Sequence, residues 1–247
     1  MTSTIARTDA TEPHATDKPV QGAPHPKDAA TLILLDRSGP TPKVLLGKRH
    51  ASHKFMPGKF VFPGGRVDPA DSRMPVARRL DPAAQSRLMK RVARPSPARA
   101  HAFALAAIRE TFEETGLLLG VPVTEIPPAP KGAWQAFAQA KILPDLSSLY
   151  FIGRAITPPG RPRRFDARFF SLDATAIARR IEGLTGPDAE LVELIWMSLP
   201  EAKQLDLSVV TVVMLEELEL RLAEGLSHDP PVPFYRMPFQ RFTREML

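Results

Sequence analysis

Apolar residues recur along the chain in two kinds of pattern, which together predict strands mixed with helices. Short apolar runs, typical of buried or half-buried strands, occur at 29–35, 44–49, 60–62, 149–156, 165–172 and 191–197. Helices are expected at 83–92, 97–115, 134–141 and 209–222. Because the two kinds of element mix without regular alternation, we expect an α+β or mixed α/β sandwich with a mixed sheet.

The segment 97–115 gives the clearest helical pattern of the chain. Leu105, Ile108 and Phe112 follow the three-to-four spacing of a buried stripe. Ser96 can cap the N-terminus, Pro97 suits the first helical position, and Gly116 stands where the chain has to leave the helix. Residues of these types at these positions predict both ends of the helix.

Polar and Pro-rich segments flank this pattern at both ends. Residues 1–28 are rich in Thr, Ala and Pro without an apolar period, which predicts a disordered tail. Residues 226–247 are Pro-rich and are expected to lie along the surface as a second tail. The folded domain is therefore expected at 29–225, and a Pro-bounded insertion interrupts it at 72–95.

Composition excludes several classes of protein. The 247 residues are 43% hydrophobic and 24% charged, an ordinary globular composition, and they include no Cys. Disulfides, thiolate metal sites and a Cys nucleophile are thereby excluded. No apolar stretch approaches the roughly 20 residues of a membrane span, and no signal peptide is recognisable. We therefore expect no membrane partner and a cytoplasmic location.

The net charge of +6 is concentrated in one segment. Residues 72–101 contain eight Arg or Lys against Asp81 alone, a net charge of +7, so the rest of the chain sums to about −1. We interpret this segment as a solvated basic face that attracts a polyanionic substrate. Nucleic acid is not the expected partner, because no aromatic residues interleave with the basic ones. Trp134 and Trp196 are expected in the core.

Three carboxylates crowd one face of the helix near its C-terminal end. Glu110, Glu113 and Glu114 lie side by side at offsets of three and four residues, where the helix dipole disfavours anions. Hard oxygen ligands in this number suit Mg²⁺ or Mn²⁺. Arg109 precedes Glu113 by four residues and can bridge to it. A solvated acidic patch is the alternative interpretation.

The sequence around these carboxylates resembles a known family motif. Arg109-Glu-Thr-Phe-Glu-Glu-Thr-Gly-Leu117 is similar to the second half of the Nudix box, although Thr111 stands where a bulkier apolar residue is usual. Gly64 and Gly65, with Asp71 six residues after Gly65, resemble the first half, in which Glu is usual at the last position. Between the halves lie 37 residues, Ser72–Ile108, rather than seven. The chain is thus similar to the branch of Nudix hydrolases with a long insertion in the box.

The resemblance implies an α/β/α sandwich that cleaves the diphosphate of X-linked nucleoside diphosphates with the help of Mg²⁺, for which Mn²⁺ can substitute. It implies metal binding by Glu110 and Glu114, with Glu113 bridging and the carbonyl of Gly64 or Gly65 as a further ligand. Glu113 and Arg109 are assigned to the catalytic set as well. By its place before the last strand, Glu190 is the candidate general base, and Glu193 is the alternative.

The substrate is a small anionic molecule, and its identity is left open. Arg49, Lys54, Gly64 and Arg66 are the candidate substrate contacts. The segment from Leu45 to Gly65 resembles the accessory motif of Nudix coenzyme A pyrophosphatases, with Gly47, His50 and Lys54 as departures. A coenzyme A or acyl-coenzyme A diphosphatase is therefore one alternative, and a non-catalytic nucleotide- or nucleic-acid-binding Nudix module is another. A homodimer is also left open.

Overall fold

The computed structural model describes residues 24–52, 56–125, 127–237 and 241–247. The tail predicted for 1–28 falls mostly outside these residues, and the first strand already begins at Lys27. Within the described ranges, no helix is long and apolar enough to cross a membrane.

A mixed sheet forms the centre of the molecule, with the order β11-β2-β1-β9-β8-β12-β13. Its strands are β1 (Lys27–Asp36), β2 (Lys43–Arg49), β8 (Tyr150–Ile156), β9 (Phe165–Asp173), β11 (Leu191–Ser198), β12 (Pro233–Arg236) and β13 (Thr243–Met246). The short strands β3 (Phe60–Val61) and β4 (Gly64–Arg66) pair with β2 and β1. The pairs β1/β9 and β8/β12 are parallel, and the other pairs of this sheet are antiparallel.

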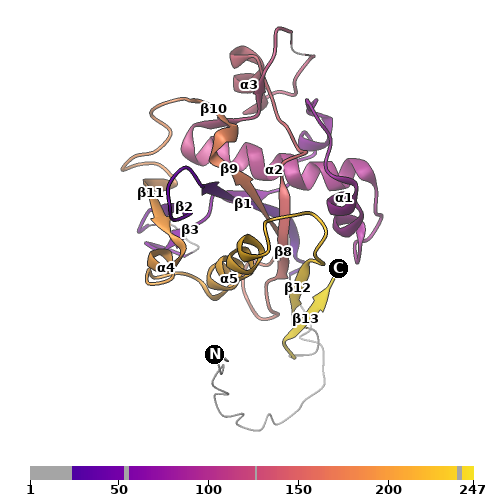
Figure 1. The fold of residues 1–247 in the computed structure, drawn as a ribbon, viewed down its shortest axis with the longest axis vertical. Helices are drawn as coiled ribbons and strands as arrows, with labels where there is room; N and C mark the ends of the chain where they lie inside the picture. Colours follow the sequence, from indigo (N-terminus) through magenta and orange to yellow (C-terminus); the bar gives the residue numbers. More distant parts are fainter. Residues whose placement is uncertain (1–23, 53–55, 126, 238–240) are drawn as a thin grey trace.

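Helices cover both faces of this sheet (Figure 1). One face carries α1 (Pro82–Met89), α2 (Pro97–Thr115) and α3 (Trp134–Ala140), whereas the other carries α4 (Leu199–Ala202) and α5 (Val209–Ala223). Two small sheets join β5 (Leu117–Leu119) to β10 (Ile177–Arg180) and β6 (Val121–Pro122) to β7 (Ile142–Leu143). Single 3₁₀ turns lie at Asp71–Arg73 and Ala174–Ala176. The expected α/β/α sandwich with a mixed sheet is confirmed.

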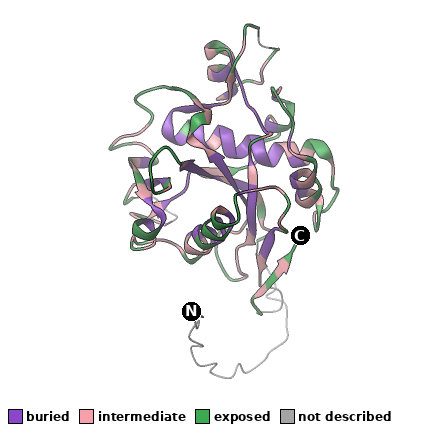
Figure 2. Ribbon diagram, viewed as in Figure 1, coloured by how far each residue is buried: buried purple, intermediate pink, exposed green. Residues whose placement is uncertain are grey.

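The central strand β1 is buried on both of its faces. Leu32 and Leu34 pack into the apolar cluster beneath α2, and Ile33 and Leu35 pack into the cluster beneath α5. Alternate side chains of a strand point to opposite faces, so one continuous apolar run serves both layers. Figure 2 shows burial concentrated in α2 and the central strands.

The helix α2 has the limits that its sequence predicts. The Ser96 hydroxyl accepts a hydrogen bond from the Arg99 backbone N–H at 3.2 Å, and Pro97 opens the helix. Gly116 ends it in the left-handed region at φ 77°, and a Cβ there would clash with the carbonyl of Ile181. Both caps are therefore fixed by local chemistry.

The net charge of the insertion 72–95 predicts a solvated basic face, but part of the insertion is buried. Its apolar residues Met74, Leu80, Ala84 and Leu88 are buried in the same cluster as α2. Ala84 and Leu88 lie on one face of α1 because they are four residues apart. These apolar residues make the segment part of the core, and its net charge alone does not predict them.

The C-terminal segment also differs from the surface tail that its Pro content predicts. Strand β12 adds to the sheet beside β8, and β13 pairs with β12. Val232, Phe234 and Leu247 are buried in the core. Arg87 of the insertion holds this segment by donating to the carbonyls of His228 and Asp229, each at 2.5 Å. Proline permits strands at a sheet edge, so composition alone was a poor guide.

Candidate active site

The two halves of the interrupted motif meet where β4 lies against the last turns of α2. β4 pairs with β1, which places Gly65 opposite Ala30. A Cβ on Gly65 would clash with the Glu110 carboxylate, and one on Gly64 would lie 2.6 Å from the carbonyl oxygen of Ala30. The Gly64 backbone N–H donates to Glu114 Oε2 at 3.1 Å. Glycine is thus required here because carboxylates and backbone approach too closely for a side chain.

Arg109 links the carboxylates of α2 to the end of β4 through its hydrogen bonds. Its Nη1 donates to Glu110 Oε1 and to Glu113 Oε2, both at 2.9 Å, and its Nη2 donates to the Arg66 carbonyl at 2.7 Å. The four-residue spacing of Arg109 and Glu113 predicts the second of these bonds. Burial opposes the charge of this guanidinium, but Asp71, Glu110 and Glu113 outweigh burial and raise the pKa of Arg109.

Asp71 is the anchor of Arg109, a role that sequence reasoning missed. It is fully buried and accepts from Arg109 Nε at 2.8 Å and from the Trp134 indole N–H at 3.2 Å. The backbone N–H of Asp68 donates to it at 2.8 Å. The position of Asp71, six residues after Gly65, could have indicated this role, but the insertion that follows Asp71 separates it from Arg109 in the sequence. Trp134 lies in the core, as expected.

The carboxylates of this site are short of positive charge. Burial raises the pKa of Glu110 to about 7. Burial, with the nearby charges of Glu190 and Glu110, raises the pKa of Glu114 well above its usual range. A buried carboxylate cluster of this kind favours protonation unless a cation neutralises it. Perturbed carboxylates in such a cluster are typical of functional sites.

The chemistry of the donors, rather than their spacing in this structure, suits a hard divalent cation. Glu110 and Glu114 supply carboxylate oxygens next to the side-chain-free backbone of Gly64 and Gly65, and both carboxylates need a positive charge. Among the residues that the structure describes, no three acidic or His side chains stand close enough together to surround an ion. Arg109 instead engages oxygens of Glu110 and Glu113, so a cation would share these oxygens with the guanidinium.

Glu190 comes to this site from a distant part of the chain. It precedes β11, and its Oε1 accepts from Arg49 Nη2 at 2.5 Å. Arg49 is buried at the end of β2, opposite Leu191. Because Glu190 and Arg49 both influence the pKa of Glu114, the structure brings this pair to the buried carboxylate. The Glu190 side chain is 44% exposed and therefore open to solvent.

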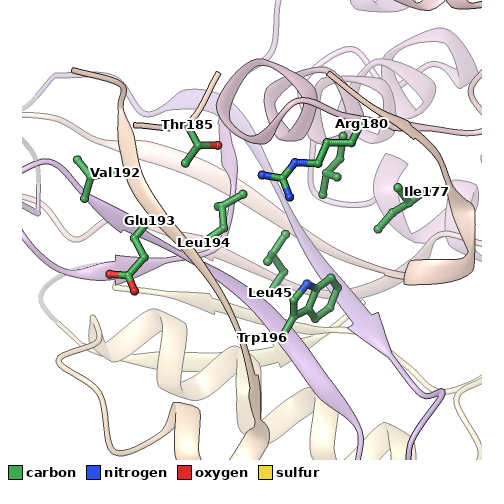
Figure 3. Close-up of a pocket in the computed structure, with 9 residues that line it drawn as sticks. Leu45, Ile177, Arg180, Thr185, Val192, Glu193, Leu194 and Trp196 are labelled. Carbon is green, nitrogen blue, oxygen red and sulfur yellow. The ribbon is translucent and has the colours of Figure 1, made fainter. Parts of the chain in front are cut away.

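The remaining predicted residues are less involved. The Arg66 side chain is exposed, and only its carbonyl enters the Arg109 network. Glu193 lies further along β11, beside a groove that also contains Trp196, and its carboxylate points away from Arg180 (Figure 3). Lys54 lies outside the described residues. Trp196 is 37% exposed, so its expected place in the core is wrong.

Comparison with known proteins adds independent observations. No protein-family model matches the chain. A putative nudix hydrolase 7 from Caenorhabditis elegans is 29% identical over 58% of this chain and 43% of its own length. Acyl-coenzyme A diphosphatase NUDT19 from Gallus gallus is 27% identical over 72% of this chain and 62% of its own length. The chain thus spans less than two thirds of either curated relative.

A solved structure supports the same relationship. A NUDIX hydrolase from Alicyclobacillus acidocaldarius is 28% identical and superimposes with a TM-score of 0.59, covering 83% of this chain and 99% of that one. The shared fold matches the observed sandwich, and both halves of the motif meet at one place in it. The motif, its assembled geometry and these relatives together show that this chain is similar to Nudix hydrolases in sequence and in fold.

Proposed function

We propose that this chain is a divalent-cation-dependent hydrolase that cleaves a diphosphate bond in a nucleoside diphosphate linked to another moiety. The observation that carries the proposal is the pair of the half-buried Glu110 and the buried Glu114, which lie against a glycine strand and have raised pKa values. A diphosphate substrate brings further negative charge, and its repulsion from these carboxylates has to be neutralised by a bound cation.

Glu110 and Glu114 would hold the cation, with the backbone carbonyl of Gly65 and the bridging Glu113 as further ligands. Mg²⁺ is the cation we propose, with Mn²⁺ as a substitute, because the donors are all hard oxygens. When bound, such an ion neutralises phosphate oxygens and acidifies a bound water. Arg109, fixed by Asp71, keeps the carboxylates in place for it.

Glu190 is the group that we assign to the attacking water. It is half exposed and close enough to Glu114 to raise the pKa of that residue. Its carboxylate can orient a water molecule and accept its proton as oxygen attacks phosphorus and the bridging P–O bond breaks. Arg49 holds Glu190 and also offers positive charge to the phosphates. Glu193 stays the alternative base from further along the strand.

Coenzyme A or an acyl-coenzyme A is the second candidate substrate. One curated relative is named an acyl-coenzyme A diphosphatase. The segment from Leu45 to Gly65 resembles the corresponding accessory motif, and its first part ends at Arg49, whose guanidinium pairs with Glu190. A non-catalytic binding module is less well supported, because all three carboxylates of the motif are present. A homodimer and a cytoplasmic location stay predictions.

Glu114→Gln tests the assignment. The change keeps the shape of the side chain and removes the charge that the cation needs, so kcat/KM should fall at least 100-fold, which corresponds to about 2.7 kcal/mol of barrier. The assay measures release of phosphate monoesters from dinucleotides, a nucleotide sugar and coenzyme A, each with Mg²⁺ and with EDTA.

Glu216→Gln, which removes an exposed carboxylate of α5, is the matched control and should keep full activity. If Glu114→Gln stayed within about threefold of the unaltered protein, or if EDTA had no effect, the metal assignment would be wrong.

A further inference from the structure

A groove of about 360 Å³ opens next to the candidate active site, on the face of the sheet that carries α2. Leu45 and Leu194 form its floor, Ile177 and Trp196 form its walls, and Arg180 reaches across it from one rim (Figure 3). Leu117 lines it as well. Leu45 and Leu117 are buried, whereas Trp196 keeps 37% of its surface exposed. An indole left open on an edge strand, rather than packed inside, offers an apolar surface to a ligand.

The groove leads away from the reacting groups. Val192 at its near end is two residues from Glu190, and Leu117 is three residues from Glu114. Along β11 the register sets Leu191 opposite Arg49 and Trp196 opposite Leu45. From Val192 to Trp196 the strand rises by four residues, or about 13 Å, so the groove extends well beyond the length of a single phosphate.

The chemistry of the floor favours a hydrocarbon over a nucleobase. The three leucines present no hydrogen-bonding atoms from their side chains. The polar side chains that line the groove are Arg180, Thr185 and Glu193. Arg180 is half exposed and pairs with Glu182 at 3.3 Å. The polar edges of a base seated on the leucines would find no partners on this floor, whereas an aliphatic arm has no polar edges to bury.

We propose that this groove binds an extended apolar arm on the far side of the scissile diphosphate, with Trp196 as its specificity-determining residue. The inference rests on the proposed function, because that function sets which end of the substrate faces Glu190. It names the substrate class, a nucleoside diphosphate esterified to a long, largely apolar group. The nucleotide half then lies on the opposite side of Arg49 and Glu190.

Two synthetic substrates of defined length test this assignment, the β-methyl and β-octyl esters of adenosine 5′-diphosphate. Each methylene that enters an apolar site strengthens binding about fourfold, so burial of only two makes the octyl ester at least tenfold better in kcat/KM. Trp196→Ala should bring the ratio of octyl to methyl ester down to within about threefold of unity. Trp196→Phe should keep most of the ratio.

Leu220→Ala is the matched control, because it removes an apolar side chain that is 60% exposed on the other face of the sheet. It should leave the ratio unchanged. Calorimetry of both esters in EDTA measures binding without turnover, and thermal unfolding verifies that each variant is folded.

The two proposals can fail separately. If neither ester is hydrolysed but the octyl ester binds more tightly through Trp196, the groove assignment stands and the proposed function falls. If both esters are hydrolysed and bound equally, or if Trp196→Ala weakens both by the same factor, the groove assignment is overturned and the hydrolase stands.

Discussion

The two ends of α2 handle buried charge in opposite ways. Its N-terminal half packs against what we call the arginine cluster, which consists of Asp28, Arg154, Asp166 and Arg168. Arg154 donates twice to Asp166, at 2.7 and 2.6 Å, and Arg168 donates to Asp28 at 2.7 Å. The guanidinium of Arg168 also lies 3.8 Å from the ring centre of Phe103 on α2. Each carboxylate in this cluster thus has guanidinium partners.

The C-terminal half carries the carboxylate cluster, Glu110, Glu113 and Glu114, where a single guanidinium, that of Arg109, pairs with Glu110, Glu113 and Asp71. Burial raises the pKa of the carboxylates at both ends of α2, but the net shift differs. At Asp28, burial is outweighed by Arg168 and Arg99, which lower the pKa. At Glu114, burial is reinforced by Glu190 and Glu110, and the pKa rises. Compensated charge stabilises the fold, whereas uncompensated charge is kept where a charged ligand is to bind.

The strongest test of this comparison is Asp166→Asn in the arginine cluster. The change leaves two buried guanidinium groups with too little negative charge, and we expect the free energy of unfolding to fall by about 4 kcal/mol. Urea unfolding measures the change. Asp173→Asn, in an exposed pair with Arg37, is the control and should lose less than about 1 kcal/mol. Equal losses in both variants would show that burial of the cluster does not matter.

Leu88→Ala extends the comparison to the insertion. Leu88 is 2% exposed in the core cluster, and its truncation should lower the free energy of unfolding by about 3 kcal/mol. Val209→Ala removes apolar atoms from a residue that is 82% exposed and should change stability by less than about 0.5 kcal/mol. If Leu88→Ala changed the free energy of unfolding as little as Val209→Ala, the insertion would not be part of the core.

Asp28→Asn probes the same cluster through pH. The lowered pKa means that Asp28 contributes stability above its unfolded pKa of 3.8, and that this contribution is lost as pH falls through the lower, folded value. At pH 7 the variant should be less stable by about 1.5 kcal/mol, because charge-assisted hydrogen bonds to Arg99 and Arg168 are weakened. The deficit should shrink below pH 3.8 in chemical unfolding curves. A deficit independent of pH would indicate lost packing alone.

The smallest expected effect has the opposite sign. In EDTA, Glu114→Gln should raise the free energy of unfolding by about 1 kcal/mol, since it removes a buried carboxylate whose charge burial and the nearby Glu190 and Glu110 disfavour. Added Mg²⁺ should then stabilise the unaltered protein and not the variant, because an ion that binds only the folded state raises its stability. Thermal unfolding with and without Mg²⁺ measures both. Destabilisation by this change in EDTA would contradict the view that Glu114 is kept for binding.

Local chemistry in the sequence determined much of this protein. The limits of α2 follow from Ser96, Pro97 and Gly116, and the spacing of Arg109, Glu110, Glu113 and Glu114 predicts that these side chains share one helical face. These features depend on residues within one or two turns of each other, so a linear pattern contains them. Most strands were likewise recognisable from short apolar runs.

Only the tertiary structure decided which distant segments share these sites. The register of β11 on β2 brings Glu190 to Arg49, and the chain beyond Gly65 folds back so that Asp71 anchors Arg109. Sheet pairing likewise leaves Trp196 open at an edge. The basic charge of 72–95 and the prolines of 226–247 concealed apolar residues that complete the core. Contacts between residues far apart in sequence depend on how whole elements pack, and no local pattern encodes that choice.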